Sequence, residues 1–139
     1  QFKFKNGVLK GLQYLIKKNY FVFVITNQAG IAKGIYTENN FYKLQIDLKN
    51  KLSKKNIFFN DVQYCPFHPK GKIKIYRKKS NLRKPNNQMV KNIFNKFLIL
   101  KKKSFMIGDK ITDKKCAQKS GLNFYYAKDN FFKQIKEII

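Results

Sequence analysis

Acidic residues are scarce in this chain of 139 residues, which has 7 Asp and Glu against 31 Lys and Arg and a formal net charge of +24. Tryptophan is absent, the arginines are Arg77 and Arg83, and the cysteines are Cys65 and Cys116. No apolar run reaches the roughly 18 residues of a membrane-spanning helix, and the first residues lack a secretory signal pattern. Two distant cysteines do not indicate a disulfide framework. We therefore expect a cytoplasmic protein with no membrane partner.

The excess of lysine does not by itself indicate nucleic acid binding. Lysines are spread from Lys3 to Lys136 without a confined block, whereas nucleic acid contacts favour arginine forks on one face. Abundant Lys, Asn, Ile and Phe with scarce Ala and Arg are typical of an A+T-rich coding sequence. We expect a solvated lysine surface that attracts phosphorylated ligands, no nucleic acid partner, and a monomer.

Strand-like and helix-like patterns of apolar residues alternate along the chain. Helices are expected around residues 8–16, 37–52, 90–97, 112–120 and 130–138, and strands around 20–25, 57–64, 104–107 and 122–126. Residues 26–36 are expected to form a loop. Residues 65–85 hold all three prolines and predict a long irregular loop with a short hairpin at Ile73 and Ile75. The alternation predicts a single α/β domain over residues 1–139 with a mainly parallel sheet.

Three short segments carry groups suited to binding phosphate, and each is expected at or near the carboxyl end of a strand. They are Ile25-Thr26-Asn27-Gln28, Arg83-Lys84-Pro85 and Ile107-Gly108-Asp109-Lys110. Ligands of open parallel sheets bind at this edge, where loops and helix N-termini gather.

Each segment has a chemical interpretation and a plain one. Thr26 could hold phosphate oxygens, or it could belong to an ordinary polar turn. Lys84 could neutralise a phosphoryl group, or it could be a solvated charge before a helix. Asp109 could hold Mg²⁺. Asp113 could orient Asp109 or Lys110, or it could only favour the helix dipole.

Four ordered motifs resemble those of haloacid-dehalogenase-type (HAD) phosphatases, in the group that acts on heptose bisphosphate and histidinol phosphate. They are the string from Val24 to Gly34, Tyr64-Cys65-Pro66-Phe67-His68-Pro69, Arg83-Lys84-Pro85, and Met106-Ile107-Gly108-Asp109-Lys110. The resemblance implies a Rossmann-like domain without a large cap. It also implies a Mg²⁺-dependent phosphatase that forms an aspartyl phosphate and acts on a small phosphorylated sugar in the synthesis of heptose precursors for surface polysaccharide.

The same resemblance implies roles for individual residues. Thr26 and the Asn27 backbone would bind the transferred phosphoryl group, and Gln28 would contact the substrate. Lys84 would stabilise its charge and Asp109 would hold Mg²⁺. Arg83 would reach the sugar or a second phosphate, and Lys110 would support the site electrostatically.

The chain departs from the family pattern at two places. Family members begin with a strand ending in Asp-x-Asp, the nucleophile and the acid–base. These residues do not contain it, so the first strand is expected to be missing and the chain to be inactive alone. Many members also hold zinc through Cys-x-His and Cys-x-Cys pairs, whereas this chain keeps only Cys65. Phe67, Ser80 and Leu82 stand at the other three positions, His68 is displaced, and we expect no zinc in the degenerate loop 65–85.

Two alternatives stay open. One is another phosphomonoesterase, acting on histidinol phosphate or on a polynucleotide 3′-phosphate. The other is a decayed, non-catalytic phosphate-binding domain.

Overall fold

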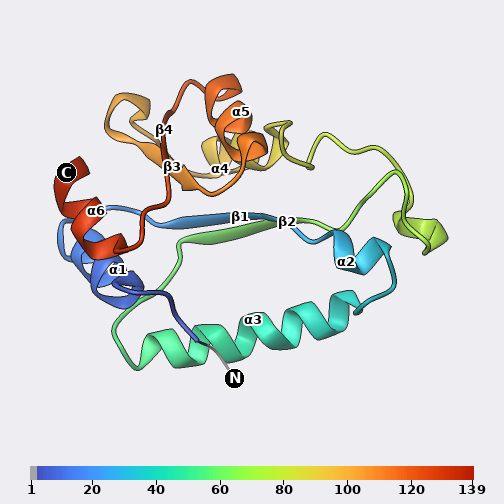
Figure 1. Cartoon of the computed structure of the whole chain (residues 1–139), viewed down its shortest axis with the longest axis horizontal. Helices are drawn as coiled ribbons and strands as arrows, with labels where there is room; N and C mark the ends of the chain where they lie inside the picture. Colours follow the sequence, from blue (N-terminus) through green and yellow to red (C-terminus); the bar gives the residue numbers. More distant parts are fainter. Residues whose placement is uncertain (1–2) are drawn as a thin grey trace. The chain divides into compact units, whose positions relative to one another are not determined.

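The computed structural model describes residues 3–139, in which helices and strands alternate as expected. The elements are α1 (Val8–Lys17), β1 (Phe23–Asn27), α2 (Ala29–Ala32), α3 (Glu38–Ser53), β2 (Asp61–Cys65), the 3-10 turn η1 (Lys74–Tyr76), α4 (Gln88–Lys96), the 3-10 turn η2 (Lys101–Lys103), β3 (Phe105–Gly108), α5 (Ile111–Lys119), β4 (Asn123–Tyr126) and α6 (Phe131–Ile138) (Figure 1). Each helix within residues 3–139 is too short or too polar to span a membrane.

The residues form two compact units. Unit 1 holds the segment ending at Val24, then Asn39–Asp61 and Ala127–Ile139. Unit 2 holds Ile25–Glu38 and Val62–Tyr126. Each unit is assembled from segments far apart in the sequence, and whether they form one domain, as the sequence predicts, stays a prediction.

Unit 1 is a helical cluster around Leu12, Leu52 and Ile57, all of which are buried. The apolar residues of α1 recur every three or four positions and so share one face. Gly11 allows close packing, because a Cβ there would lie 2.3 Å from the Phe131 ring at the start of α6. Helix α6 is capped by the preceding Asn130, whose side chain accepts a hydrogen bond from the Lys133 N–H at 3.1 Å.

Unit 2 contains β3, β4 and most of β1 and β2. β3 and β4 are parallel, from Phe105 opposite Asn123 to Gly108 opposite Tyr126, and α5 packs on both. β1 and β2 form a second two-stranded sheet and run in the same direction in Figure 1. The expected α/β class with parallel strands is confirmed, because both crossovers carry helices.

The hairpin expected at Ile73 and Ile75 is wrong. The Ile73 N–H donates to the Ala32 carbonyl at 2.9 Å, and residues 74–76 form the turn η1. The loop therefore docks on α2 and does not pair with itself. Helix α2 lies inside the segment 26–36 that the sequence predicts as a loop, because Gly30 and Gly34 obscure a helix of only four residues.

Candidate active site

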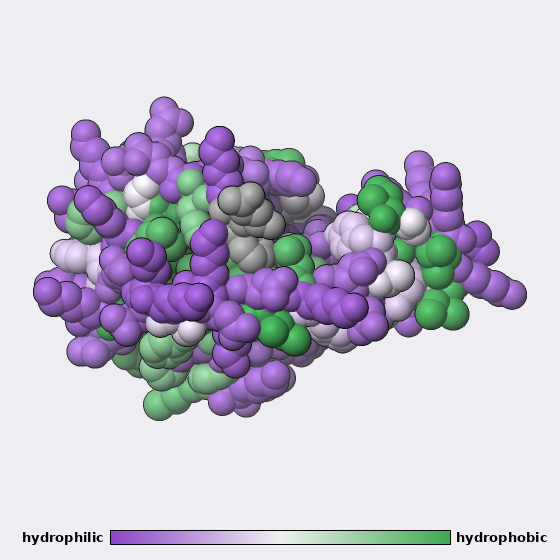
Figure 2. Space-filling view, turned by 90° about the horizontal axis from the view of Figure 1, so that it is seen from below, coloured by the Kyte–Doolittle hydropathy of each residue, from purple (hydrophilic) through white to green (hydrophobic). Residues whose placement is uncertain are grey.

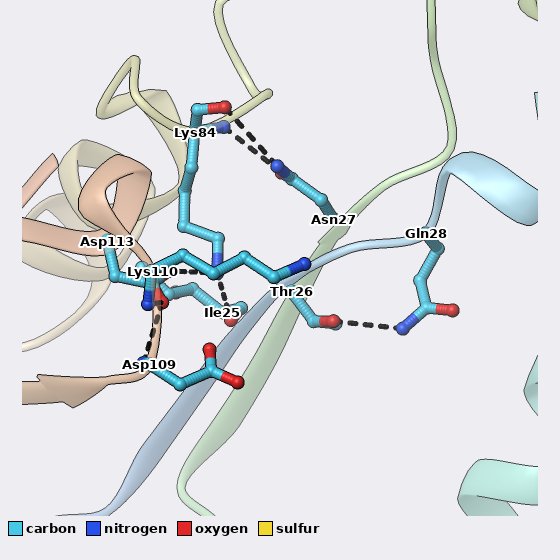
Figure 3. Close-up of polar contacts among 8 residues, drawn as sticks. All are labelled: Ile25, Thr26, Asn27, Gln28, Lys84, Asp109, Lys110 and Asp113. Atoms are coloured by element: carbon cyan, nitrogen blue, oxygen red, sulfur yellow. Dashed lines mark hydrogen bonds and ion pairs between the residues drawn. The ribbon is translucent and has the colours of Figure 1, made fainter. Parts of the chain in front are cut away.

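Unit 2 brings the three predicted segments together. Thr26 and Asn27 lie at the end of β1, and Lys84 lies in the loop before α4. Asp109 and Lys110 follow β3, and Asp113 lies in the first turn of α5. Figure 3 shows these side chains from separate strands around Lys84.

The centre of the site is an ion pair between Lys84 and Asp113. Lys84 Nζ lies 2.6 Å from Asp113 Oδ1 and also donates to the Ile25 carbonyl at 3.4 Å. The side chains are only 13% and 6% exposed, so water screens the pair weakly. Burial alone would raise the pKa of Asp113. The hydrogen bond and charge of Lys84, with two backbone N–H groups, outweigh burial and lower that pKa.

The second carboxylate oxygen of Asp113 shapes the chain after β3. Oδ2 accepts hydrogen bonds from the N–H groups of Asp109 and Lys110, each at 3.1 Å. Gly108 makes this possible, since a Cβ there would lie 2.5 Å from Oδ2. Asp113 therefore fixes both the Lys84 ammonium and the backbone that carries Asp109.

The side chain of Asn27 fixes the backbone of Lys84. Asn27 Oδ1 accepts from the Lys84 N–H at 3.0 Å, and Asn27 Nδ2 donates to the Lys84 carbonyl at 3.3 Å. This paired contact ties the irregular loop to the end of β1. The Asn27 side chain is thus occupied by protein, and the substrate contact predicted for this residue rests on its backbone.

Thr26 is oriented through Gln28. Gln28 Nε2 donates to Thr26 Oγ1 at 2.9 Å, and the Tyr36 hydroxyl donates to Gln28 Oε1. Because the Thr26 oxygen accepts from Gln28, its hydroxyl proton is left to donate to a ligand. Burial raises the pKa of Tyr36, so its hydroxyl stays a donor.

Asp109 and Lys110 have exposed side chains at the end of β3. In Figure 3 the Asp109 carboxylate lies apart from the Lys84–Asp113 pair, and the Lys110 side chain extends across the view toward the Thr26 side. A carboxylate suits Mg²⁺, and Asp109 fits as one ligand. Residues 3–139 offer no group of three or more Asp, Glu, His or Cys that could hold a metal, so Asp109 supplies only part of a ligand set.

Arg83 has a buried nitrogen without a protein partner. Its Nη1 makes no hydrogen bond within the described part of the chain. Such a group is costly to bury unless a ligand satisfies it. Desolvation lowers the pKa of the nearby His68, and the positive charges of Arg83, Lys33 and Lys70 lower it further. The surroundings of Arg83 therefore favour an anion.

Of the four positions at which family members hold zinc, this chain keeps a cysteine only at Cys65. Cys65 is free and buried, and its Sγ contacts the Phe67 carbonyl at 3.7 Å. Burial raises the pKa of the Cys65 thiol. One thiol cannot supply the tetrahedral ligand set of a structural zinc, and the absence of zinc from this loop stays a prediction.

The sequence undervalued two residues. The sequence predicts that Asp113 orients the Asp109 or Lys110 side chain or favours the helix dipole. In the structure its carboxylate binds the backbone N–H groups of these two residues and pairs with Lys84. Tyr36 carried no prediction. Only the scarcity of carboxylates marks Asp113 in the sequence, and no sequence signal marks Tyr36.

The resemblance to HAD phosphatases is confirmed by comparison with known proteins. A family model described as HAD-hydrolase-like matches residues 81–134. A D-glycero-beta-D-manno-heptose-1,7-bisphosphate 7-phosphatase from Haemophilus influenzae is 34% identical over 114 residues, which is 82% of this chain and 61% of the relative. The enzyme of the same name from Rhodopseudomonas palustris is 30% identical, over 84% of this chain and 64% of the relative. The chain thus spans less than two thirds of the length of these relatives.

Solved structures show the same fold. A D,D-heptose 1,7-bisphosphate phosphatase from B. bronchiseptica, in complex with magnesium and phosphate, superposes with a TM-score of 0.75 at 18% identity, covering 94% of this chain and 69% of that one. A protein from Mesorhizobium loti described as a HAD-like phosphatase gives a TM-score of 0.82 at 21% identity, covering 95% and 70%.

Proposed function

Because this chain resembles HAD phosphatases in both sequence and fold, we propose that the protein containing it is a phosphomonoesterase that removes the 7-phosphate of D-glycero-D-manno-heptose 1,7-bisphosphate. The names of the sequence relatives support this substrate. The product would serve heptose precursor synthesis for lipopolysaccharide or another surface polysaccharide in the cytoplasm.

The observation that carries the proposal is the fixed position of Lys84 at the end of β1. Asn27 holds the Lys84 backbone and Asp113 holds its ammonium, so the positive charge is in place before a substrate arrives. Phosphoryl transfer depends mainly on charges positioned around the phosphoryl oxygens. Lys84 would stabilise that charge, and the Thr26 hydroxyl and the Asn27 N–H would orient the group.

Asp109, Lys110 and Arg83 would complete the binding site. Mg²⁺, with Asp109 as one ligand, would supply further positive charge when bound. Lys110 would add to the positive field. Arg83 would bind the sugar or its second phosphate through the nitrogen that lacks a protein partner. The aspartyl phosphate that the resemblance implies needs a carboxylate nucleophile and an acid–base, and none of these three residues is given either role.

The test measures phosphate release from the heptose bisphosphate by the whole protein with Mg²⁺. The Lys84→Ala variant should lower kcat/KM by about 100-fold or more, because a fixed charge at the reacting group is lost. Lys102→Ala is the matched control, since Lys102 is exposed in η2, and it should leave the rate unchanged. Release by the unaltered protein no faster than by Lys84→Ala would refute the proposal.

A substrate panel separates the remaining candidates. Histidinol phosphate and a polynucleotide 3′-phosphate are compared with the heptose bisphosphate. Arg83→Met should raise KM for the bisphosphate, whereas Arg77→Met, which changes the exposed arginine of the loop, should not. A preference for the polynucleotide end would replace the proposed substrate. Binding of phosphate without turnover of any substrate would favour a non-catalytic domain.

A further inference from the structure

One surface of unit 2 combines clustered positive charge with exposed aliphatic side chains. We call it the loop surface. Its cations are Lys70, Lys72, Lys74, Arg77, Lys78 and Lys79, all exposed, and residues 70–79 contain no carboxylate. Its aliphatic residues are Ile35, Ile73 and Ile75, which are 73%, 39% and 72% exposed.

The loop surface is held in shape by contacts within unit 2. The Ile73 N–H donates to the Ala32 carbonyl, and a Cβ at Gly71 would lie 2.8 Å from the Ala32 Cβ, so the loop packs closely on α2. A Cβ at Gly34 would lie 3.3 Å from Ile73 Cδ1, so the Ile73 side chain lies against the backbone at the residue before Ile35. Figure 2 shows green apolar residues among purple hydrophilic ones at this right-hand end.

The phosphate site gives these isoleucines no role. Their exposure costs free energy in water, because aliphatic surface is left hydrated. Exposed apolar residues surrounded by cations are typical of surfaces that enter the headgroup region of a membrane. The apolar tips are buried at the acyl boundary, and lysines meet the headgroup phosphates.

We propose that the loop surface docks the protein on a membrane rich in anionic phospholipid. Ile35 and Ile75 enter the interface, and the six cations contact headgroup phosphates. A nucleic acid partner fits less well, since single strands bind through aromatic stacking and bases are read by arginine forks. Here the exposed apolar residues are aliphatic and five of the six cations are lysines. The proposal does not depend on the phosphatase proposal. It differs from the expectation, drawn from the lack of long apolar runs, that the protein has no membrane partner.

The absence of tryptophan allows a direct test. Ile75→Trp places a single tryptophan on the loop surface. Leu98→Trp is the matched control, because Leu98 is 95% exposed and lies near the lysines of η2. With vesicles of phosphatidylcholine and about one third phosphatidylglycerol, the Ile75→Trp emission should shift to the blue, and with pure phosphatidylcholine it should not. No shift at position 75, or an equal shift at position 98, would overturn the proposal.

A second measurement separates a defined surface from diffuse attraction by the net charge. The triple change Lys72→Gln, Lys74→Gln and Lys79→Gln should weaken vesicle co-sedimentation about 100-fold. The same change at Lys101, Lys102 and Lys103 removes equal charge from η2 and should have a much smaller effect. Equal losses in both variants would refute the loop surface. Tight binding to DNA that depends on the loop lysines but not on Ile35 or Ile75 would indicate nucleic acid instead.

Discussion

Lys84 is held through both its backbone and its side chain. Its backbone is bound by Asn27, and its ammonium is bound by Asp113 and the Ile25 carbonyl. A buried ion pair gains little net stability, because both charges lose water. Removing one partner is costly, however, since it leaves the other charge buried and unpaired. The pair is therefore better explained as a device that holds a lysine in one position.

The first prediction concerns Asp113→Asn, which keeps the shape and removes the charge. We expect this variant to lose about 3 kcal/mol of unfolding free energy at pH 7, because Lys84 is left without a counter-charge. The lowered pKa of Asp113 sets the pH dependence. The stability that this group contributes is present above about pH 4 and is lost as the pH falls through its lowered pKa. The difference between the two proteins should thus shrink toward pH 2.

Urea unfolding between pH 2 and pH 7 measures this difference. Asp129→Asn is the matched control, because Asp129 is an exposed carboxylate in unit 1, and it should change stability little at any pH. If Asp113→Asn and Asp129→Asn unfold at the same urea concentration at pH 7, the ion pair does not hold Lys84 in position.

The spacing of apolar residues along the chain predicts where most helices lie, because this pattern is local. It predicts the starts of the strands less well. The helices α1, α4, α5 and α6 lie where the spacing of apolar residues predicts them. The strand starts were placed too early. The Tyr20 N–H bonds to the Leu15 carbonyl, and the Ile57 N–H bonds to the Leu52 carbonyl, so these apolar residues close helix ends before each strand begins.

The site was predictable in its parts but not in its pairing. The sequence located the three segments, because each follows or precedes a recognisable element. It could not single out the ion pair, since Lys84 and Asp113 are 29 residues apart and the chain has many lysines. The two charges meet only in the folded chain, where Asn27 at the end of β1 holds the Lys84 backbone and α5 carries Asp113.

The second prediction concerns the anchor of loop 66–80. Glu38, at the start of α3, accepts hydrogen bonds from the hydroxyls of Tyr64 and Tyr76. Through these two hydrogen bonds the Glu38 carboxylate links η1 to β2 and to the start of α3. Glu38→Ala should speed amide exchange in residues 70–79 by about tenfold, because charged hydrogen bonds contribute about 1.5–3 kcal/mol each and part of this is recovered by water.

Hydrogen exchange followed by mass spectrometry resolves this loop from the rest of the chain. Asp47→Ala is the control, since Asp47 is an exposed carboxylate on the same helix, and it should leave the loop unchanged. Unaltered exchange of residues 70–79 in Glu38→Ala would show that other contacts hold the loop.

Charge imbalance acts on the molecule as a whole. With 31 cations and 7 carboxylates, most lysines cannot have an acidic partner of their own, and their mutual repulsion opposes the compact state. In the proposed function this positive field would attract phosphorylated ligands from a distance. The repulsion lowers the free energy of unfolding. Most of it acts between exposed side chains, so salt can screen it.

The third prediction is that added salt stabilises the protein. Between about 20 and 300 mM NaCl the Debye length falls from roughly 20 to 6 Å, so repulsion between exposed lysines weakens, whereas the buried Lys84–Asp113 pair is screened little. We expect the melting temperature to rise by several degrees.

The triple change of Lys101, Lys102 and Lys103 to Gln should raise the melting temperature at low salt and reduce the further gain from NaCl, because three adjacent charges are removed from η2. Calorimetry in a dilute buffer without phosphate checks this. A melting temperature that stays constant or falls with NaCl would mean that the carboxylate pairs, and not lysine repulsion, dominate the electrostatic part of the stability.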